Sequence, residues 1–85
     1  MNDDFVRRRS ADFARRITTE NLSDTGARVE QAFRIALGRA PSSAERATAM
    51  SFLTSQAERY SGDQARAFDD FCQVLFGMNE FLYVD

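Results

Sequence analysis

The stretch of sequence from residue 29 to residue 45 reads VEQAFRIALGRAPSSAE. Its first part repeats apolar residues at spacings of three and four, the pattern of a helix with one buried stripe. The stripe consists of Val29, Phe33, Ala36, Leu37 and Ala40. Gly38 stands where a helix ends in the left-handed conformation, and Pro41 prevents continuation. We therefore expect a helix that begins near Asp24 or Thr25 and ends at Leu37.

The residues after Pro41 match the capping box that starts a helix. The Ser42 hydroxyl can accept a hydrogen bond from the Glu45 amide, while the Glu45 carboxylate reaches back to the cap. This pattern predicts a helix from Ser43 to Tyr60, ended by Ser61 and Gly62. Its expected face consists of Arg46, Met50, Leu53, Ala57 and Tyr60, with Ala49 and Phe52 beside it.

Two further helices are expected on either side of this central pair. The first runs from Asp3 to Thr18, and a loop then extends to Asp24. The last runs from Gln64 to Phe76 with Gly77 as its stop. Their apolar stripes are Val6, Phe13, Ala14 and Ile17 in the first, and Phe68, Phe71, Cys72, Leu75 and Phe76 in the last. Residues 1–85 should form one all-α domain, a compact bundle of four helices.

The C-terminal segment is too apolar to stay in water without cover. We expect a short helical turn capped by Asn79, followed by a tail that docks on the bundle. Phe81 and at least one of the three residues that follow it should pack against the first two helices. These three residues are Leu82, Tyr83 and Val84, and the expected sockets are Val6, Phe13, Val29 and Phe33.

Composition excludes several classes of function. The 85 residues include one cysteine and no histidine, so an internal disulfide, a His-based triad and His-ligated zinc are excluded. No stretch has the roughly 18 consecutive apolar residues of a transmembrane helix. Residues 1–4 lack an apolar h-region, so no secretory signal is expected. The acidic residues show no calcium-loop spacing. We expect no catalytic residue, no cofactor and no metal.

Arg39 is the most informative polar residue, because it lies in the turn between Gly38 and Pro41. Its guanidinium can bond the last carbonyls of the preceding helix or pair with a carboxylate. Residues 60–85 carry one arginine against five acidic residues, which makes Glu80 the attractive partner. An exposed arginine at a helix end is the alternative. The structural or interaction candidates are Arg39, Pro41, Ser42, Glu45, Glu80 and Phe81.

Three other features invite a sharper interpretation. One is a set of arginines that could contact nucleic acid: Arg7, Arg8, Arg9, Arg15 and Arg16. Consecutive residues of a helix point in different directions around its axis, and acidic residues lie between these arginines, so a solvated face with local ion pairs is favoured. The two helices joined at Pro41 also resemble a DNA-binding helix-turn-helix that would present Glu45, Arg46 and Thr48 to the bases. Cys72 lies within the most apolar helix, which favours core packing over reactivity.

Beyond these patterns, the chain resembles a large planctomycete family of exported proteins over almost its whole length. The resemblance lies in residues 29–45, in the ending CQVLFGMNEFLYVD (residues 72–85), and in the opening residues 1–6 with Ala11, Phe13, Ala14 and Ile17. Family members contain a cytochrome-c-like segment and two domains of unknown function, and this chain looks like the end of the last domain. The haem does not carry over, because its attachment needs Cys-x-x-Cys-His. A weaker likeness exists to helical repeats of bacterial surface proteins, which share the Leu-Gly-Arg-x-Pro turn, a later Phe-Leu and a terminal Glu-Phe.

These observations favour a non-catalytic structural or protein-interaction module, in which residues 1–85 form the end of a longer exported parent. The expected partner is protein, either another domain of the parent or a surface partner. A small nucleic-acid-binding helix-turn-helix domain is the alternative, although the net charge of −2 disfavours it. An enzyme would need partner domains to complete its site.

Overall fold

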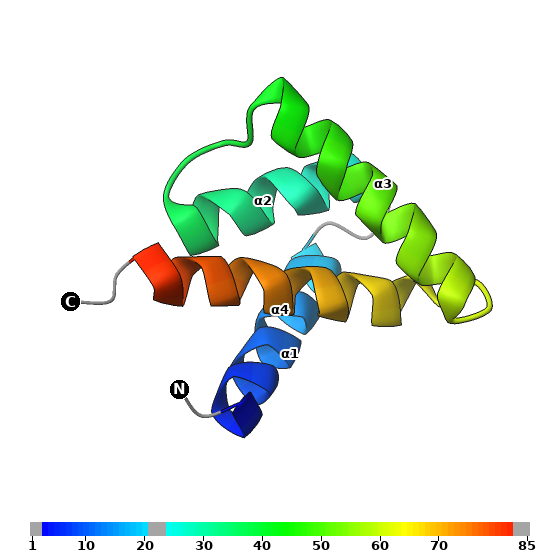
Figure 1. The fold of residues 1–85 in the computed structure, drawn as a ribbon, viewed down its shortest axis with the longest axis horizontal. Coiled ribbons are helices and arrows are strands. Elements are labelled where there is room, and N and C mark those ends of the chain that lie inside the picture. Colours follow the sequence, from blue (N-terminus) through cyan, green and yellow to red (C-terminus); the bar gives the residue numbers. More distant parts are fainter. Residues whose placement is uncertain (1–2, 21–23, 83–85) are drawn as a thin grey trace.

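The computed structural model of the chain describes the backbone of residues 3–20 and 24–82, and the side chains of residues 7–17 and 24–78. It contains four helices: α1 (Asp3–Glu20), α2 (Thr25–Leu37), α3 (Ser43–Arg59) and α4 (Gln64–Leu82). The described ranges contain no strand (Figure 1). The predicted all-α bundle of four helices is therefore confirmed.

The ends of α2 and the start of α3 follow the local sequence signals. Asp24 caps α2, since its carboxylate accepts a hydrogen bond from the Gly26 amide at 2.9 Å. Gly38 closes α2 in the left-handed conformation, with φ of 75°. The capping box of α3 is complete: Glu45 N donates to Ser42 Oγ at 3.1 Å, and Ser42 N donates to Glu45 Oε1 at 2.9 Å.

Two predicted helix ends are wrong. α1 continues to Glu20 rather than ending at Thr18, which shortens the predicted loop. α4 runs through Gly77 to Leu82, so Gly77 is no stop and Asn79 caps no separate turn. Glycine inside a helix costs only about 1 kcal/mol relative to alanine, which the hydrogen bonds of a continuing helix offset. The predicted docking of the tail side chains, Phe81 included, lies outside the described residues.

The turn between α3 and α4 is a Schellman motif. The Gly62 amide donates to Ala57 O at 2.7 Å, and the Ser61 amide donates to Glu58 O at 3.2 Å. Ser61 adopts a φ of 57°, a left-handed conformation that is uncommon outside glycine. Asp63 then accepts from the Arg66 amide at the start of α4. The turn fixes the point from which α3 and α4 diverge (Figure 1).

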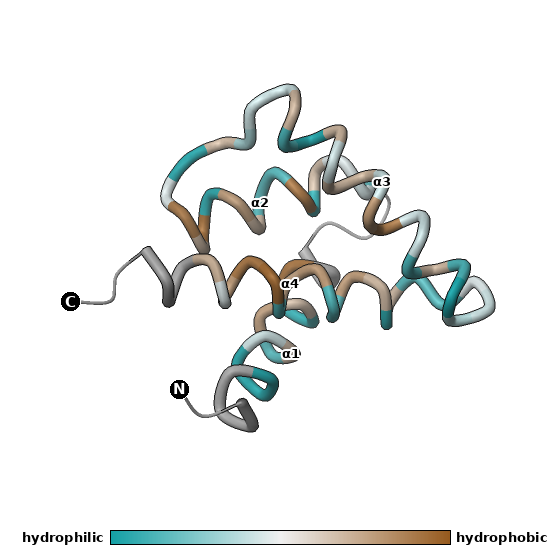
Figure 2. Tube along the Cα trace, in the orientation of Figure 1, coloured by the Kyte–Doolittle hydropathy of each residue, from teal (hydrophilic) through white to brown (hydrophobic). Residues whose placement is uncertain are grey.

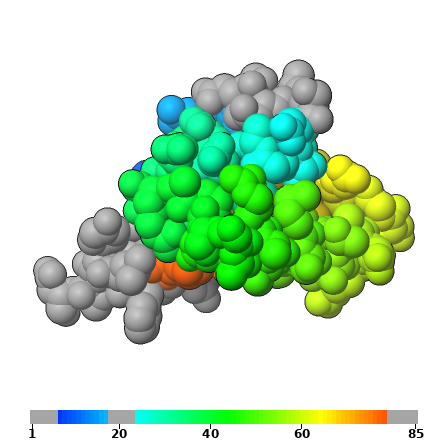
Figure 3. Space-filling view, turned by 90° about the horizontal axis from the view of Figure 1, so that it is seen from above, coloured from blue at the N-terminus to red at the C-terminus, as the bar shows by residue number. Residues whose placement is uncertain are grey.

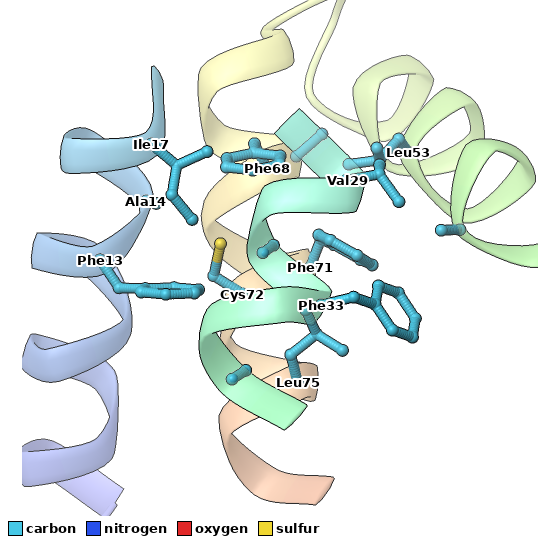
Figure 4. Close-up of a cluster of buried hydrophobic side chains, with 14 residues drawn as sticks. Phe13, Ala14, Ile17, Val29, Phe33, Leu53, Phe68, Phe71, Cys72 and Leu75 are labelled. Carbon is cyan, nitrogen blue, oxygen red and sulfur yellow. The ribbon is translucent and has the colours of Figure 1, made fainter. Parts of the chain in front are cut away.

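The core is organised around α4, which lies between α1 on one side and α2 and α3 on the other (Figures 1 and 4). Apolar residues concentrate in the middle of α4 (Figure 2). The buried apolar residues are Phe13, Ala14, Ile17, Val29, Ala32, Phe33, Ala36, Ala49, Leu53, Ala67, Phe68, Phe71, Cys72 and Leu75. The stripes expected for α1, α2 and α4 therefore supply most of this core, and the side chain of Val6 lies outside the described residues. The face expected for α3 is wrong in part: Leu53 and its neighbour Ala49 are buried, whereas Met50 is 38% exposed.

Candidate functional site

The α2–α3 turn is built around an ion pair between Arg39 and Glu45. The two guanidinium nitrogens of Arg39 donate to the two carboxylate oxygens of Glu45, at 2.7 and 2.9 Å. The guanidinium also donates to Ala40 O at 3.3 Å and lies over the Phe33 ring, 5.9 Å from its centroid. Glu45 is thus the partner that the structure shows for Arg39. The side chain of the expected partner, Glu80, lies outside the described residues.

Glu45 holds the turn and the start of α3 together. Its carboxylate accepts from both Arg39 and the Ser42 amide, and these bonds lower its pKa to about 2. The same pair raises the pKa of Arg39. Pro41 directly precedes the cap residue Ser42 and offers no amide to this network. Four sequence-predicted candidates therefore form one small preorganised unit.

Glu45 connects this unit to the rim of an apolar cavity of about 300 Å³, which lies between the first half of α3 and the second half of α4. The lining residues are Phe33 from α2, Ala44, Glu45, Thr48, Ala49 and Phe52 from α3, and Phe71, Val74, Leu75 and Met78 from α4. The floor is aromatic, since the Phe71 ring centroid lies 6.3 Å from that of Phe33 and 6.4 Å from that of Phe52.

Two large apolar side chains of α4 stand open at this cavity. Val74 is 49% exposed and Met78 is 42% exposed, although both belong to the most apolar part of the chain. Figure 3 shows the described end of α4, in orange, emerging beside the green atoms of α2 and α3. Exposed apolar side chains grouped around an aromatic floor are a feature of interaction surfaces.

A second cavity, of about 400 Å³, continues the first along the same two helices. It is lined by Phe52, Gln56, Asp70, Gln73 and Val74, so Phe52 and Val74 border both cavities. Together they form what we call the α3–α4 groove. Its far end is polar: Asp70 Oδ2 accepts from Gln56 Nε2 at 2.7 Å and from the Tyr60 hydroxyl at 2.6 Å. The bond to Asp70 raises the pKa of Tyr60.

A separate cleft of about 470 Å³ lies where α2 begins, beside the α3–α4 turn. It is lined by Thr25, Arg28, Met50, Leu53, Thr54, Ala57, Glu58, Ser61, Gly62, Gln64, Ala67 and Phe68. One of its polar groups, the Thr54 hydroxyl, already donates a hydrogen bond to Met50 O at 3.0 Å. Of the candidates predicted from the sequence, Glu45 lines the α3–α4 groove, and none of the four described ones (Arg39, Pro41, Ser42 and Glu45) lines this cleft.

The side chains of the predicted recognition helix are engaged within the molecule. Arg46 donates to Gly26 O and to Glu30 Oε1, both at 3.3 Å, and so ties α3 to the start of α2. Glu45 is held by Arg39, as described above. Thr48 is exposed at the α3–α4 groove. Two of the three side chains proposed to read DNA bases therefore serve the fold.

Cys72 is a core residue, as predicted. Its side chain is fully buried, and Figure 4 shows the sulfur in the layer between α4 and α1, close to Phe13 and Ala14. Burial, with a smaller contribution from the negative charge of Asp69, raises the pKa of the thiol well above its ordinary range. Such a thiol is a poor nucleophile at neutral pH.

The arginines of α1 lie on an exposed face, as the solvated alternative predicts. Arg7, Arg8 and Arg9 are all exposed, and Arg15 pairs with Asp12 one turn earlier. Between them Ser10 is buried, and its hydroxyl donates to Arg7 O at 3.0 Å.

Sequence reasoning did not identify the groove, although a signal for it exists. Phe71, Val74 and Met78 follow each other at spacings of three and four, a second stripe on α4 beside the buried one. Only the Phe71 position belongs to both stripes. A helix with two apolar stripes needs two neighbours, and the residues described on α3 cover the second stripe in part.

Other kinds of site find no support in the part of the chain described by the structure. Over residues 7–17 and 24–78, no cluster of three or more His, Cys, Asp or Glu side chains could hold a metal ion. None of the four helices, as far as they are described, has the length and apolarity needed to cross a membrane. No family model matches the chain, and no curated protein or solved structure is similar to it.

Proposed function

We propose that the chain is a non-catalytic protein-interaction module and that the α3–α4 groove receives an amphipathic helix of a partner polypeptide. The observation that carries the proposal is the pair of exposed apolar side chains, Val74 and Met78, beside an aromatic floor. Helix-in-groove recognition uses this arrangement of an apolar channel between two helices. The flexible thioether of Met78 also suits an adaptable contact surface.

The size of the groove supports a helix as the occupant. The α3 wall extends from Glu45 to Gln56, which corresponds to about 17 Å at 1.5 Å per residue. A partner helix of about three turns has the same length. The Arg39–Glu45 pair fixes one end of the groove before the partner arrives, which lowers the entropic cost of binding.

The state of the titratable side chains supports a non-catalytic role. The Cys72 thiol is sealed in the core. The carboxylate of Glu45 accepts three internal hydrogen bonds, and that of Asp70 accepts two. The two carboxylates thus stabilise the α2–α3 turn and the contact between α3 and α4.

A nuclear magnetic resonance titration tests the proposal. The probe is an uncharged peptide of about 14 residues, made of Ala and Gln with Leu at helical spacing. We expect chemical-shift changes at Phe52, Val74 and Met78, and loss of binding in Val74→Glu. Ile35→Glu is the matched control, because Ile35 is also an exposed apolar residue, 40% exposed, but does not line the groove. Absence of shifts, or shifts confined to other surfaces, would overturn the proposal.

A nucleic-acid-binding helix-turn-helix domain is the second candidate, and the succession of α2, a short turn and α3 supports it. The engagement of Glu45 and Arg46 within the molecule weighs against it. A gel shift at low and moderate salt separates the two candidates. Binding that falls steeply with salt would favour nucleic acid, whereas no binding would remove this candidate.

We also propose that the partner helix belongs to the same parent protein, because the chain resembles the end of a longer planctomycete protein. The resemblance includes residues 29–45, which supply Phe33, Ala44 and Glu45 to the groove. The test is the reading frame around the codon for Met1. An open frame that continues upstream into further helical domains would support the proposal, and a stop codon directly upstream would overturn it.

A further inference from the structure

We infer that the helix received by the α3–α4 groove carries a basic residue that meets Asp70. This inference rests on the function proposed above and specifies the chemistry of the partner. It starts from the charges of the groove: among the described residues that line it, two are acidic, Glu45 and Asp70, and none is an arginine. The two carboxylates lie at opposite ends of the groove.

The two carboxylates differ in what neutralises them. Glu45 is already paired with the guanidinium of Arg39 through two hydrogen bonds. Asp70 is held by two neutral donors, the Gln56 amide and the Tyr60 hydroxyl. Neutral donors carry no positive charge, so hydrogen bonds from them do not cancel the charge of a carboxylate as a guanidinium does. Asp70 therefore leaves a negative charge at its end of the groove.

Two exposed arginines lie near this end of the groove without pairing with Asp70. Arg66 lies one turn before Asp70, and its guanidinium lies over the ring of Tyr60, 4.2 Å from the centroid. The charges of Arg66 and Arg59 both act on the Tyr60 hydroxyl, so they offset the charge of Asp70 in part. Within the described part of the chain no ion pair joins Arg66 to Asp70. Asp70 is also half-buried, so water screens its charge less than on an open surface.

The position of Asp70 places the basic residue on the partner. On α4, Asp70 and Met78 are about 12 Å apart along the axis. A helix whose apolar stripe covers Val74 and Met78 therefore reaches Asp70 with the turn that follows the stripe. A lysine or arginine there would form an ion pair with Asp70, whereas a glutamate would be repelled.

Three peptides test the inference on the intact chain by fluorescence anisotropy. The three peptides share one leucine stripe. One helical turn beyond each end of this stripe, the first peptide carries Arg, the second Gln and the third Glu. Placing the residue at both ends brings one copy to Asp70 in either binding direction. We expect the Arg peptide to bind at least about threefold more tightly than the Gln peptide, and the Glu peptide to bind more weakly. The difference should shrink at high salt.

Asp70→Asn should remove the difference between the three peptides while leaving the Gln peptide bound. Asp69→Asn is the matched control, because Asp69 is the exposed neighbour and does not line the groove. If Asp70→Asn does not fold, as judged by circular dichroism, the peptide order and its salt dependence in the wild-type chain decide the question.

The outcomes separate this inference from the proposed function. Equal binding of all three peptides, or preference for Glu, would overturn the inference and leave the groove as a neutral apolar site. Failure of all three to bind would overturn the proposed function. A concentration-dependent dimer in analytical ultracentrifugation, abolished by Val74→Glu, would identify a second copy of the chain as the occupant and overturn both.

Discussion

The two sides of α4 differ in how completely they are covered. Towards α1, Ile17 and Cys72 are fully buried, and the Phe13 and Phe76 rings meet edge to face with centroids 4.7 Å apart. Towards α3, Val74 remains half exposed. One helix of 19 residues thus has a sealed side and an open side. Apolar content alone does not decide which positions become core.

The difference follows from how the neighbouring helices meet α4. α1 runs steeply across α4, so its stripe lies directly on the middle of that helix (Figure 1). α3 is joined to α4 by the short turn at Ser61 and Gly62 and diverges from it, so close contact gives way to the groove. The one aromatic residue of α2, Phe33, contributes to the floor of the groove.

The largest expected effect is on the sealed side. Ile17→Ala should lower the free energy of unfolding by about 2–5 kcal/mol, because it leaves a cavity where the wild-type side chain is fully buried. The control is Ile35→Ala, the same substitution at an exposed position of α2, which should cost less than about 1 kcal/mol. Urea denaturation followed by circular dichroism measures both. Similar losses at the two positions would contradict the distinction between covered and open positions.

Because of Cys72, the free energy of unfolding should depend on pH. Burial raises its thiol pKa, so the protonated form is favoured in the folded state. Its contribution is complete below the unfolded pKa of about 8.5 and is lost as pH rises above it. At about pH 9.5 the free energy of unfolding should be about 1.4 kcal/mol lower than at neutral pH. In Cys72→Ala this decline should be absent. Equal declines in the wild type and the variant would show that the Cys72 thiol does not cause the decline.

On the open side, the rim depends on the cap of α3. Ser42→Ala should lower the free energy of unfolding by about 1 kcal/mol, because the Glu45 amide loses its acceptor. Ser43→Ala is the control, since Ser43 is exposed and lies just inside the helix. A denaturant midpoint that both variants leave unchanged would mean that α3 begins at another residue.

The smallest effect concerns the second half of α4, which forms one wall of the groove. Gly77→Ala should raise the free energy of unfolding by about 0.5–1 kcal/mol, since the added methyl group meets no atom within 4 Å and the helix is continuous there. Gly62→Ala should have the opposite sign, because Gly62 has a φ of 91°. A thermal melt of both variants checks the signs. Destabilisation by Gly77→Ala would indicate that α4 ends at this residue.

What could be predicted from the sequence is local. The Ser42 cap, the Gly38 stop and the burial of Cys72 depend on neighbouring residues or on one helix stripe, and all three are confirmed. The helix end predicted at Gly77 is wrong, because glycine either stops a helix or lies within it, depending on whether the following residues stay helical.

The candidate site could be predicted only in part. The turn residues were identified, but the charge distribution favoured the distant Glu80 as the partner of Arg39. The partner that the structure shows is Glu45, six positions along the chain. The groove itself depends on the angle between α3 and α4. Hydrophobic periodicity indicates which face of a helix is apolar, but not how closely a neighbour covers it.

The helix α3 is held near both of its ends. Close to the turn at Ser61 and Gly62, Gln56 and Tyr60 both donate to Asp70 of α4. About 20 Å away along α3, Glu45 accepts from Arg39 in the preceding turn. The position of the α3 wall of the groove is therefore set at two separate points, and loss of one set of contacts leaves the other in place.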